Sequence, residues 1–97
     1  MPVELKLHPR AEKELRAAFL WYRDRNALVA EAFRAEAEHA IESIAENPVR
    51  WPKLSDVLRS YVFPRFPITV VYRLKSDFVE VIAAAHQKRK PGYWGER

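Results

Sequence analysis

The sequence contains no cysteine, so disulfides, thiolate zinc sites and cysteine nucleophiles are all excluded. It has only two glycines, Gly92 and Gly95, which leaves no glycine-rich loop of the kind that cradles phosphate groups. No stretch approaches the roughly 18 consecutive apolar residues of a membrane span. The first residues contain no apolar run of the signal-peptide type. We therefore expect a cytoplasmic protein that makes no contact with a membrane.

Length and composition predict one folded domain over residues 1–97. Hydrophobic residues make up 48% of the chain, enough for a single core. The formal net charge of +4 is unevenly distributed. Residues 1–58 contain nine Lys and Arg against ten Asp and Glu, whereas residues 59–97 contain eight against three. The positive C-terminal part indicates either a polyanionic or acidic partner or a solvated basic tail.

The N-terminal half has the pattern of a strand followed by two helices. Alternating apolar residues predict a half-buried strand at Val3, Leu5 and Leu7. Pro9 suits the first turn of a helix over about residues 9–24. The apolar stripe of this helix consists of Leu15, Ala18, Phe19 and Tyr22. Asn26 is a suitable N-cap for a second helix, which ends at Asn47-Pro48. The second stripe consists of Ala30, Phe33, Ala37, Ile41 and Ile44. Two such helices should form an antiparallel hairpin.

The C-terminal half predicts three further strands. Residues 59–63 are short and β-prone, residues 68–74 alternate in polarity, and residues 78–85 are rich in Val and Ile. The polar residues 75–77 between the last two runs indicate a β-hairpin. The predicted fold is α+β in the order β-α-α-β-β-β, with the helical hairpin on one face of a mainly antiparallel four-stranded sheet. On the other face we expect Thr69, Val71 and Arg73, with residues after Ala85 folding across it.

Residues 86–94 hold most of the side chains that can carry chemistry. The His86 imidazole can transfer protons near neutral pH. The cations Lys88, Arg89 and Lys90 can bind phosphate or carboxylate groups, and Tyr93 and Trp94 can stack on bases or fill partner pockets. A structural interpretation stays open for each of them. His86 can cap the strand end, the cations can form a solvated run, and the aromatics can pack on the core.

Arg65 and Arg73 are candidates to extend this anion-binding surface. Arg65 lies at the entry to the strand at 68–74, where an exposed edge charge is the alternative interpretation. The three histidines are far apart in the sequence, and His39 has no histidine partner four residues away. We therefore predict neither a metal site nor a cofactor.

Two runs of sequence, from Arg65 to Arg73 and from Ala85 to Trp94, resemble the C-terminal half of RelE/ParE-type toxins, often called plasmid stabilisation proteins. The N-terminal half agrees with this resemblance through Pro9, Ala11, Leu15, Trp21-Tyr22 and the exit Asn47-Pro48 to Trp51-Pro52. The resemblance covers nearly the whole chain. It implies the β-α-α-β-β-β order and a toxin that is encoded beside its antitoxin.

The partner that the resemblance implies is a cognate antitoxin, ParD-like or similar, which wraps a helix and an extended segment over the toxin. The implied antitoxin contacts are Phe19, Tyr22, Phe33, Arg65 and Arg73. Such a toxin would reach operator DNA only through the antitoxin.

The implied target divides within the family. RelE-like members cleave mRNA on the ribosome, and His86, Arg89 and Tyr93 lie near the positions of their catalytic residues. ParE-like members inhibit growth by binding DNA gyrase, here through a target- or anion-binding set of Arg65, Arg73, Lys88, Arg89, Lys90 and Trp94. Ribonucleolytic relatives often carry a basic residue near Thr69 and more lysines around Lys53, which favours the ParE-like alternative. An inactive member that only binds its antitoxin is the third possibility.

Overall fold

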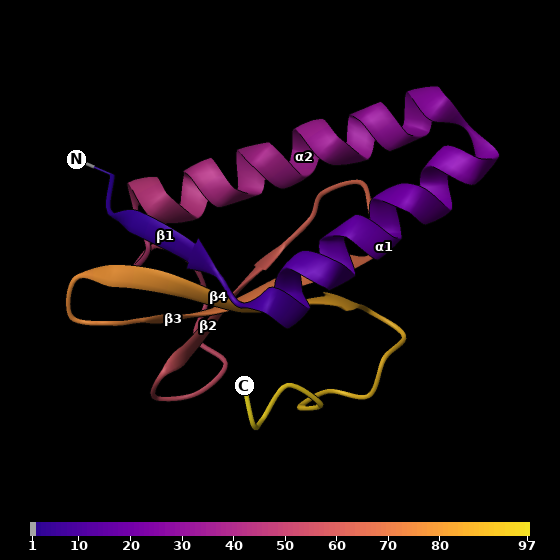
Figure 1. Ribbon diagram of the computed structural model, residues 1–97. Coiled ribbons are helices and arrows are strands. Elements are labelled where there is room, and N and C mark those ends of the chain that lie inside the picture. Colours follow the sequence, from indigo (N-terminus) through magenta and orange to yellow (C-terminus); the bar gives the residue numbers. More distant parts are fainter. Residues whose placement is uncertain (1) are drawn as a thin grey trace.

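The computed structural model describes residues 2–97 and contains two helices and four strands in the predicted order. A short strand β1 (Glu4–Leu7) precedes the helices α1 (Pro9–Arg25) and α2 (Ala27–Glu46). Three strands follow, β2 (Leu58–Val62), β3 (Ile68–Leu74) and β4 (Phe78–His86). Both helices lie on one side of the sheet, and the segment after β4 curls around its other side (Figure 1). The predicted α+β fold is confirmed.

Local signals set the ends of the helices. The Asn26 side chain accepts hydrogen bonds from the backbone N–H groups of Leu28 and Val29, at 2.9 and 3.3 Å. These bonds satisfy two of the N–H groups that the first turn of α2 would otherwise leave unpaired. Pro9 begins α1, where its missing N–H costs no hydrogen bond. The apolar stripe of α2 is confirmed at Ala30, Phe33 and Ile44, but Ile41 is only half-buried.

The strand order in the sheet is β1-β4-β3-β2. β4 and β3 pair antiparallel, as do β3 and β2, whereas β1 runs parallel to β4 from Glu4 opposite Phe78 to Leu7 opposite Val81. The sheet is therefore mainly antiparallel, as predicted. Because β1 is short, β4 continues for five residues beyond the end of its neighbour, and this unpaired edge lies beside α1.

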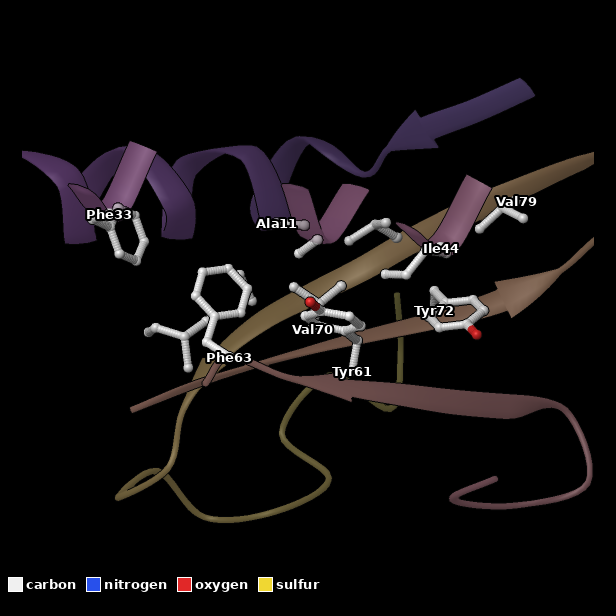
Figure 2. Close-up of a cluster of buried hydrophobic side chains, with 12 residues drawn as sticks. Ala11, Phe33, Ile44, Tyr61, Phe63, Val70, Tyr72 and Val79 are labelled. Carbon is white, nitrogen blue, oxygen red and sulfur yellow. The ribbon is translucent and has the colours of Figure 1, made fainter. Parts of the chain in front are cut away.

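The main core lies between the helices and the sheet (Figure 2). The helices contribute Ala11, Phe33 and Ile44, and the facing side chains of the sheet are Tyr61, Val70, Tyr72, Val79 and Val81. A smaller apolar cluster on the opposite sheet face holds Val71, Ile82 and Ala83, against which Leu58 and Trp94 pack. The prediction that residues after Ala85 fold across this face is confirmed by Trp94.

A β-bulge changes which side chains of β4 face the helices. Val71 pairs with Ala83 and the next residue, Tyr72, pairs with Val81, so Ile82 is the extra residue. Before the bulge, Val81 points into the main core; after it, Ala84 does. Ile82 and Ala83 therefore both pack on the opposite face, where Trp94 covers them.

Candidate functional site: a groove between α1 and the end of β4

An open groove of about 560 Å³ lies between α1 and the last residues of β4. Its walls are mainly apolar, and one end carries charge. The α1 positions recur at the spacing of one helix face, and the small side chains at 17 and 18 leave space between helix and sheet. The lining residues from α1 are Glu14, Ala17, Ala18, Trp21 and Tyr22, and those from the sheet and its loops are Pro67, Ile68, Ala84, His86 and Arg89.

Glu14 is the hub of the charged end of the groove. Its carboxylate accepts hydrogen bonds from the Ala84 backbone N–H at 3.0 Å and from the Tyr93 hydroxyl at 2.6 Å. The Arg97 guanidinium donates to both carboxylate oxygens, at 2.8 and 3.2 Å. The Arg89 guanidinium lies 3.6 Å away as a further ion-pair partner. One side chain of α1 therefore joins β4 to the C-terminal segment, residues 87–97.

The open edge of β4 explains this arrangement. β1 ends opposite Val81, so the next backbone groups on that edge have no strand to pair with. The Glu14 carboxylate takes the Ala84 N–H, and the Arg97 guanidinium donates to the Ile82 carbonyl at 3.0 Å. Unpaired backbone groups in a buried edge would cost free energy. The two side chains thus replace the strand that is absent there.

The contacts of Glu14 shift two pKa values. Burial opposes ionisation of Glu14, but the bonds from Arg97, Tyr93 and Ala84 outweigh it and lower the pKa of this carboxyl. Burial and the bond to Glu14 together raise the pKa of Tyr93 to about 12. The Tyr93 hydroxyl therefore stays protonated at neutral pH and makes a poor general base.

The three predicted catalytic residues converge near the end of β4. His86 is exposed, and its Nδ1 accepts a hydrogen bond from the Lys88 backbone N–H at 3.1 Å. The Arg89 guanidinium stacks on the Tyr93 ring, 3.8 Å from its centroid. Tyr93 and Trp94 are both half-buried and contact each other edge to face.

The predicted anion-binding residues differ in exposure and in their ion-pair partners. Lys88 and Lys90 are exposed in the turn after β4. Arg65 bonds to the buried Glu36 of α2 at 3.0 Å, although its own side chain stays largely exposed. Arg73 pairs with Glu80 at 3.0 Å and donates to the Arg97 carbonyl, which holds it on the sheet near the C-terminal segment. The charge of Arg73 is thus already balanced by Glu80.

The predicted antitoxin-binding aromatics lie at different depths. Tyr22 lines the groove and is open to contact. Phe19 is half-buried and packs against the core. Phe33 is 1% exposed and touches the rings of Tyr22 and Phe66. The prediction that a partner contacts Phe33 directly does not fit this burial, because the apolar stripe of α2 that contains Phe33 packs against the sheet.

Glu14 was not among the residues that the sequence singled out. Its position on the inner face of a helix is the only local signal. Its partners Ala84, Tyr93 and Arg97 lie 70 to 83 residues further along the chain, so no motif spacing connects them. Within residues 2–97, no group of three His, Asp or Glu side chains is placed to hold a metal ion. Neither helix in this range is long and apolar enough to cross a bilayer.

The family model described as "ParE toxin of type II toxin-antitoxin system, parDE" matches residues 5–91. The chain belongs to this family. The match spans both helices, the strands β2, β3 and β4, all of β1 except Glu4, and the turn after β4, so it includes every lining residue of the groove. The RelE/ParE resemblance of the sequence is thereby confirmed.

Solved structures show the same fold. A chain of the chromosomal ParDE toxin–antitoxin system from P. aeruginosa is similar to this ParE-family chain with a TM-score of 0.75 and 15% identity, covering 87% of this chain and 95% of that one. A mutant of the E. coli toxin RelE in the free state has a TM-score of 0.59 and 17% identity, covering 91% and 86%. A search of curated proteins finds no match.

Proposed function

We propose that this ParE-family toxin is neutralised by a cognate antitoxin of the ParD type and inhibits growth by binding DNA gyrase, without cutting RNA. The protein would then act in the cytoplasm, where gyrase and DNA are found. Any contact with operator DNA would be made through the antitoxin.

The observation that carries the proposal is the commitment of the Tyr93 hydroxyl to Glu14. Cleavage of RNA by its own 2′-hydroxyl needs a base that can take up the proton of that hydroxyl. The Tyr93 hydroxyl already donates to Glu14, and its pKa of about 12 keeps it protonated. Only the His86 imidazole remains as a proton-transfer group at this end of the groove, which supports a binding toxin.

The groove supports an antitoxin as partner. Its walls of Ala17, Ala18, Trp21 and Ile68 suit the apolar face of a helix or extended segment. The Trp21 side chain is 53% exposed, so it offers a large apolar surface that a partner could cover. The exposed cations Lys88 and Lys90 stand beyond the charged end. A segment with apolar anchors followed by acidic residues would match both features.

Purified toxin added to gyrase tests the proposal. We expect inhibition of DNA supercoiling, relieved by the antitoxin encoded in the adjacent gene. Replacing Lys88 and Lys90 together by alanine should weaken inhibition about tenfold, because local positive charge steers association with an acidic or DNA-bearing target. The variant Lys75→Ala is the matched control, since Lys75 lies in the turn between β3 and β4 at the opposite end of the sheet. Full supercoiling activity at saturating toxin would refute the gyrase proposal.

A second candidate is the RelE-like ribonuclease, favoured by the placement of exposed His86 beside Arg89 at one end of the groove. Induction of the toxin alone in cells separates the two candidates. A ribonuclease predicts cuts in translated mRNA that disappear with His86→Ala, whereas a gyrase toxin predicts intact mRNA and a DNA-damage response. An inactive member predicts normal growth.

A further inference from the structure

Three consecutive cations follow β4, but among the described residues only the middle one contacts other side chains. Among the described residues, the side chains of Lys88 and Lys90 make no ion pair or hydrogen bond. The Arg89 guanidinium, by contrast, stacks on Tyr93 at 3.8 Å and lies 3.6 Å from the Glu14 carboxylate. It also lines the groove, whereas its two lysine neighbours do not. Arg89 is therefore the cation that a ligand in the groove would meet, and it is also the one that Tyr93 and Glu14 contact.

The support for Arg89 runs back to the sheet through Glu14. The same carboxylate oxygen, Oε2, accepts the Tyr93 hydroxyl and faces Arg89. The other oxygen, Oε1, accepts the Ala84 N–H and an Arg97 N–H. The edge of β4 thus fixes Oε1, while Oε2 accepts from Tyr93 and also from an Arg97 N–H at 3.2 Å. These charge-assisted bonds give the carboxylate a defined geometry, and Arg89 meets it as an ion pair at 3.6 Å with its side chain 55% exposed.

We propose that Glu14 is a positioning residue that holds the Arg89 guanidinium at the charged end of the groove, and that partner affinity depends on this orientation. The proposal rests on the proposed function, since the partner is the antitoxin segment that occupies the groove. Glu14 acts through Tyr93 and Arg89 and need not touch the partner itself. The partner group that meets Arg89 is a carboxylate, the natural counterpart of a guanidinium.

Simple electrostatics predicts the opposite effect of removing Glu14. Replacing it by glutamine makes the toxin more positive by one charge, which should strengthen attraction of an acidic segment. If Glu14 positions Arg89, the same substitution should weaken binding, because an unheld arginine loses conformational freedom when it binds. The sign of the change therefore separates a positioning role from a purely electrostatic one.

The test measures binding of a synthetic peptide from the C-terminal segment of the antitoxin encoded in the adjacent gene. The variants are Glu14→Gln, Arg89→Ala and the double variant, each checked by circular dichroism to be folded at the temperature used. The matched control is Glu12→Gln, an exposed residue on the same helix that loses the same charge. We expect about tenfold weaker binding for Arg89→Ala and for Glu14→Gln, and unchanged or slightly tighter binding for Glu12→Gln.

The double variant decides whether Glu14 acts through Arg89. We expect Glu14→Gln to cause no further loss once Arg89 is alanine, whereas a general structural effect would add to the first loss. Tyr93→Phe leaves every charge in place and removes only the bond from the hydroxyl to Glu14, so it should weaken binding in the same direction. Tighter binding by Glu14→Gln, additive losses in the double variant, or an inert Arg89→Ala would each overturn the proposal.

A direct measurement keeps this inference apart from the proposed function. The Arg89 Nε–H signal in nuclear magnetic resonance reports the order of the guanidinium without any partner. We expect a higher order parameter for this N–H group in the wild type and in Glu12→Gln than in Glu14→Gln. If the wild type fails to bind the peptide, the antitoxin proposal fails. An Arg89 signal that is equally mobile in wild type and variant shows instead that Glu14 does not hold the guanidinium.

Discussion

Replacing Glu14 by glutamine removes one charge and almost no volume from the junction of α1, β4 and the C-terminal segment. The Glu14 side chain is 15% exposed and that of Arg97 is 9% exposed. Glutamine keeps one acceptor oxygen but brings an amide group that cannot accept. At least one of the bonds from Ala84, Tyr93 and Arg97 must therefore be lost, and Arg97 loses its counter-charge.

The structure sets the size of the expected loss of stability. Removing one partner of a buried ion pair costs about 3–5 kcal/mol, because the other charge stays buried without compensation. Water reaches part of this pair, and the guanidinium still donates to the Ile82 carbonyl, so we take about 3 kcal/mol at neutral pH. In a domain of this size each kcal/mol shifts the melting temperature by about 4–8 °C, which gives a fall of about 12–24 °C.

The loss should depend on pH in a defined direction. In the folded chain the pKa of Glu14 lies below its ordinary value of 4.5. A group with a lowered pKa stabilises the fold fully above the pKa of the unfolded chain, and the stabilisation disappears as the pH falls through the folded pKa. Glutamine takes up no proton, so the variant lacks this dependence. The difference in unfolding free energy between wild type and variant should have its full size at neutral pH and should become smaller below about pH 4.5.

Thermal unfolding followed by circular dichroism at neutral pH and at about pH 3 measures both effects. Glu12→Gln serves as the control, because Glu12 is exposed and surface substitutions typically change stability by under about 0.5 kcal/mol. If the melting temperatures of wild type and Glu14→Gln differ by the same amount at both pH values, the linkage argument is refuted. If at neutral pH Glu14→Gln lowers the melting temperature no more than Glu12→Gln does, Glu14 is not a structural hub.

Two further predictions concern the core and the groove. Phe33→Ala should destabilise the fold by about 3–5 kcal/mol in urea unfolding, because it empties the centre of an aromatic cluster. Leu28→Ala, at an 82% exposed position, should cost under about 0.5 kcal/mol, and equal losses would contradict the assignment of the core. Ala17→Trp should fill the groove and weaken antitoxin binding at least about tenfold while the fold is kept. Arg16→Trp, one residue earlier and not part of the groove lining, should bind normally; full binding by Ala17→Trp would mean that the partner docks elsewhere.

The elements of this fold could be predicted from the sequence because each has a local signal. Asn26 ends one helix and caps the next, Asn47-Pro48 ends the second, and the alternation over residues 68–74 matches β3. The sequence also points to the groove residues Tyr22, His86 and Arg89, through their chemistry and their place in the family pattern. The sequence places Phe33 on the apolar stripe of the second helix, and the family resemblance adds it to the antitoxin contacts. The structure buries it in the core, because an apolar stripe on a helix does not say what will cover it.

Only the tertiary structure placed β1 parallel to β4, because strand order depends on which surfaces pack best and not on local propensity. The bulge at Ile82 likewise comes from the pairing with β3, and it decides that Trp94 meets an apolar face. The hub at Glu14 is the clearest case. In the sequence Glu14 is an ordinary residue of a helix. Its carboxylate gains hydrogen-bond partners only when folding brings α1 next to the open edge of β4 and to residues near the C-terminus. Hydrogen bonds across such separations follow from packing, and no sequence spacing encodes them.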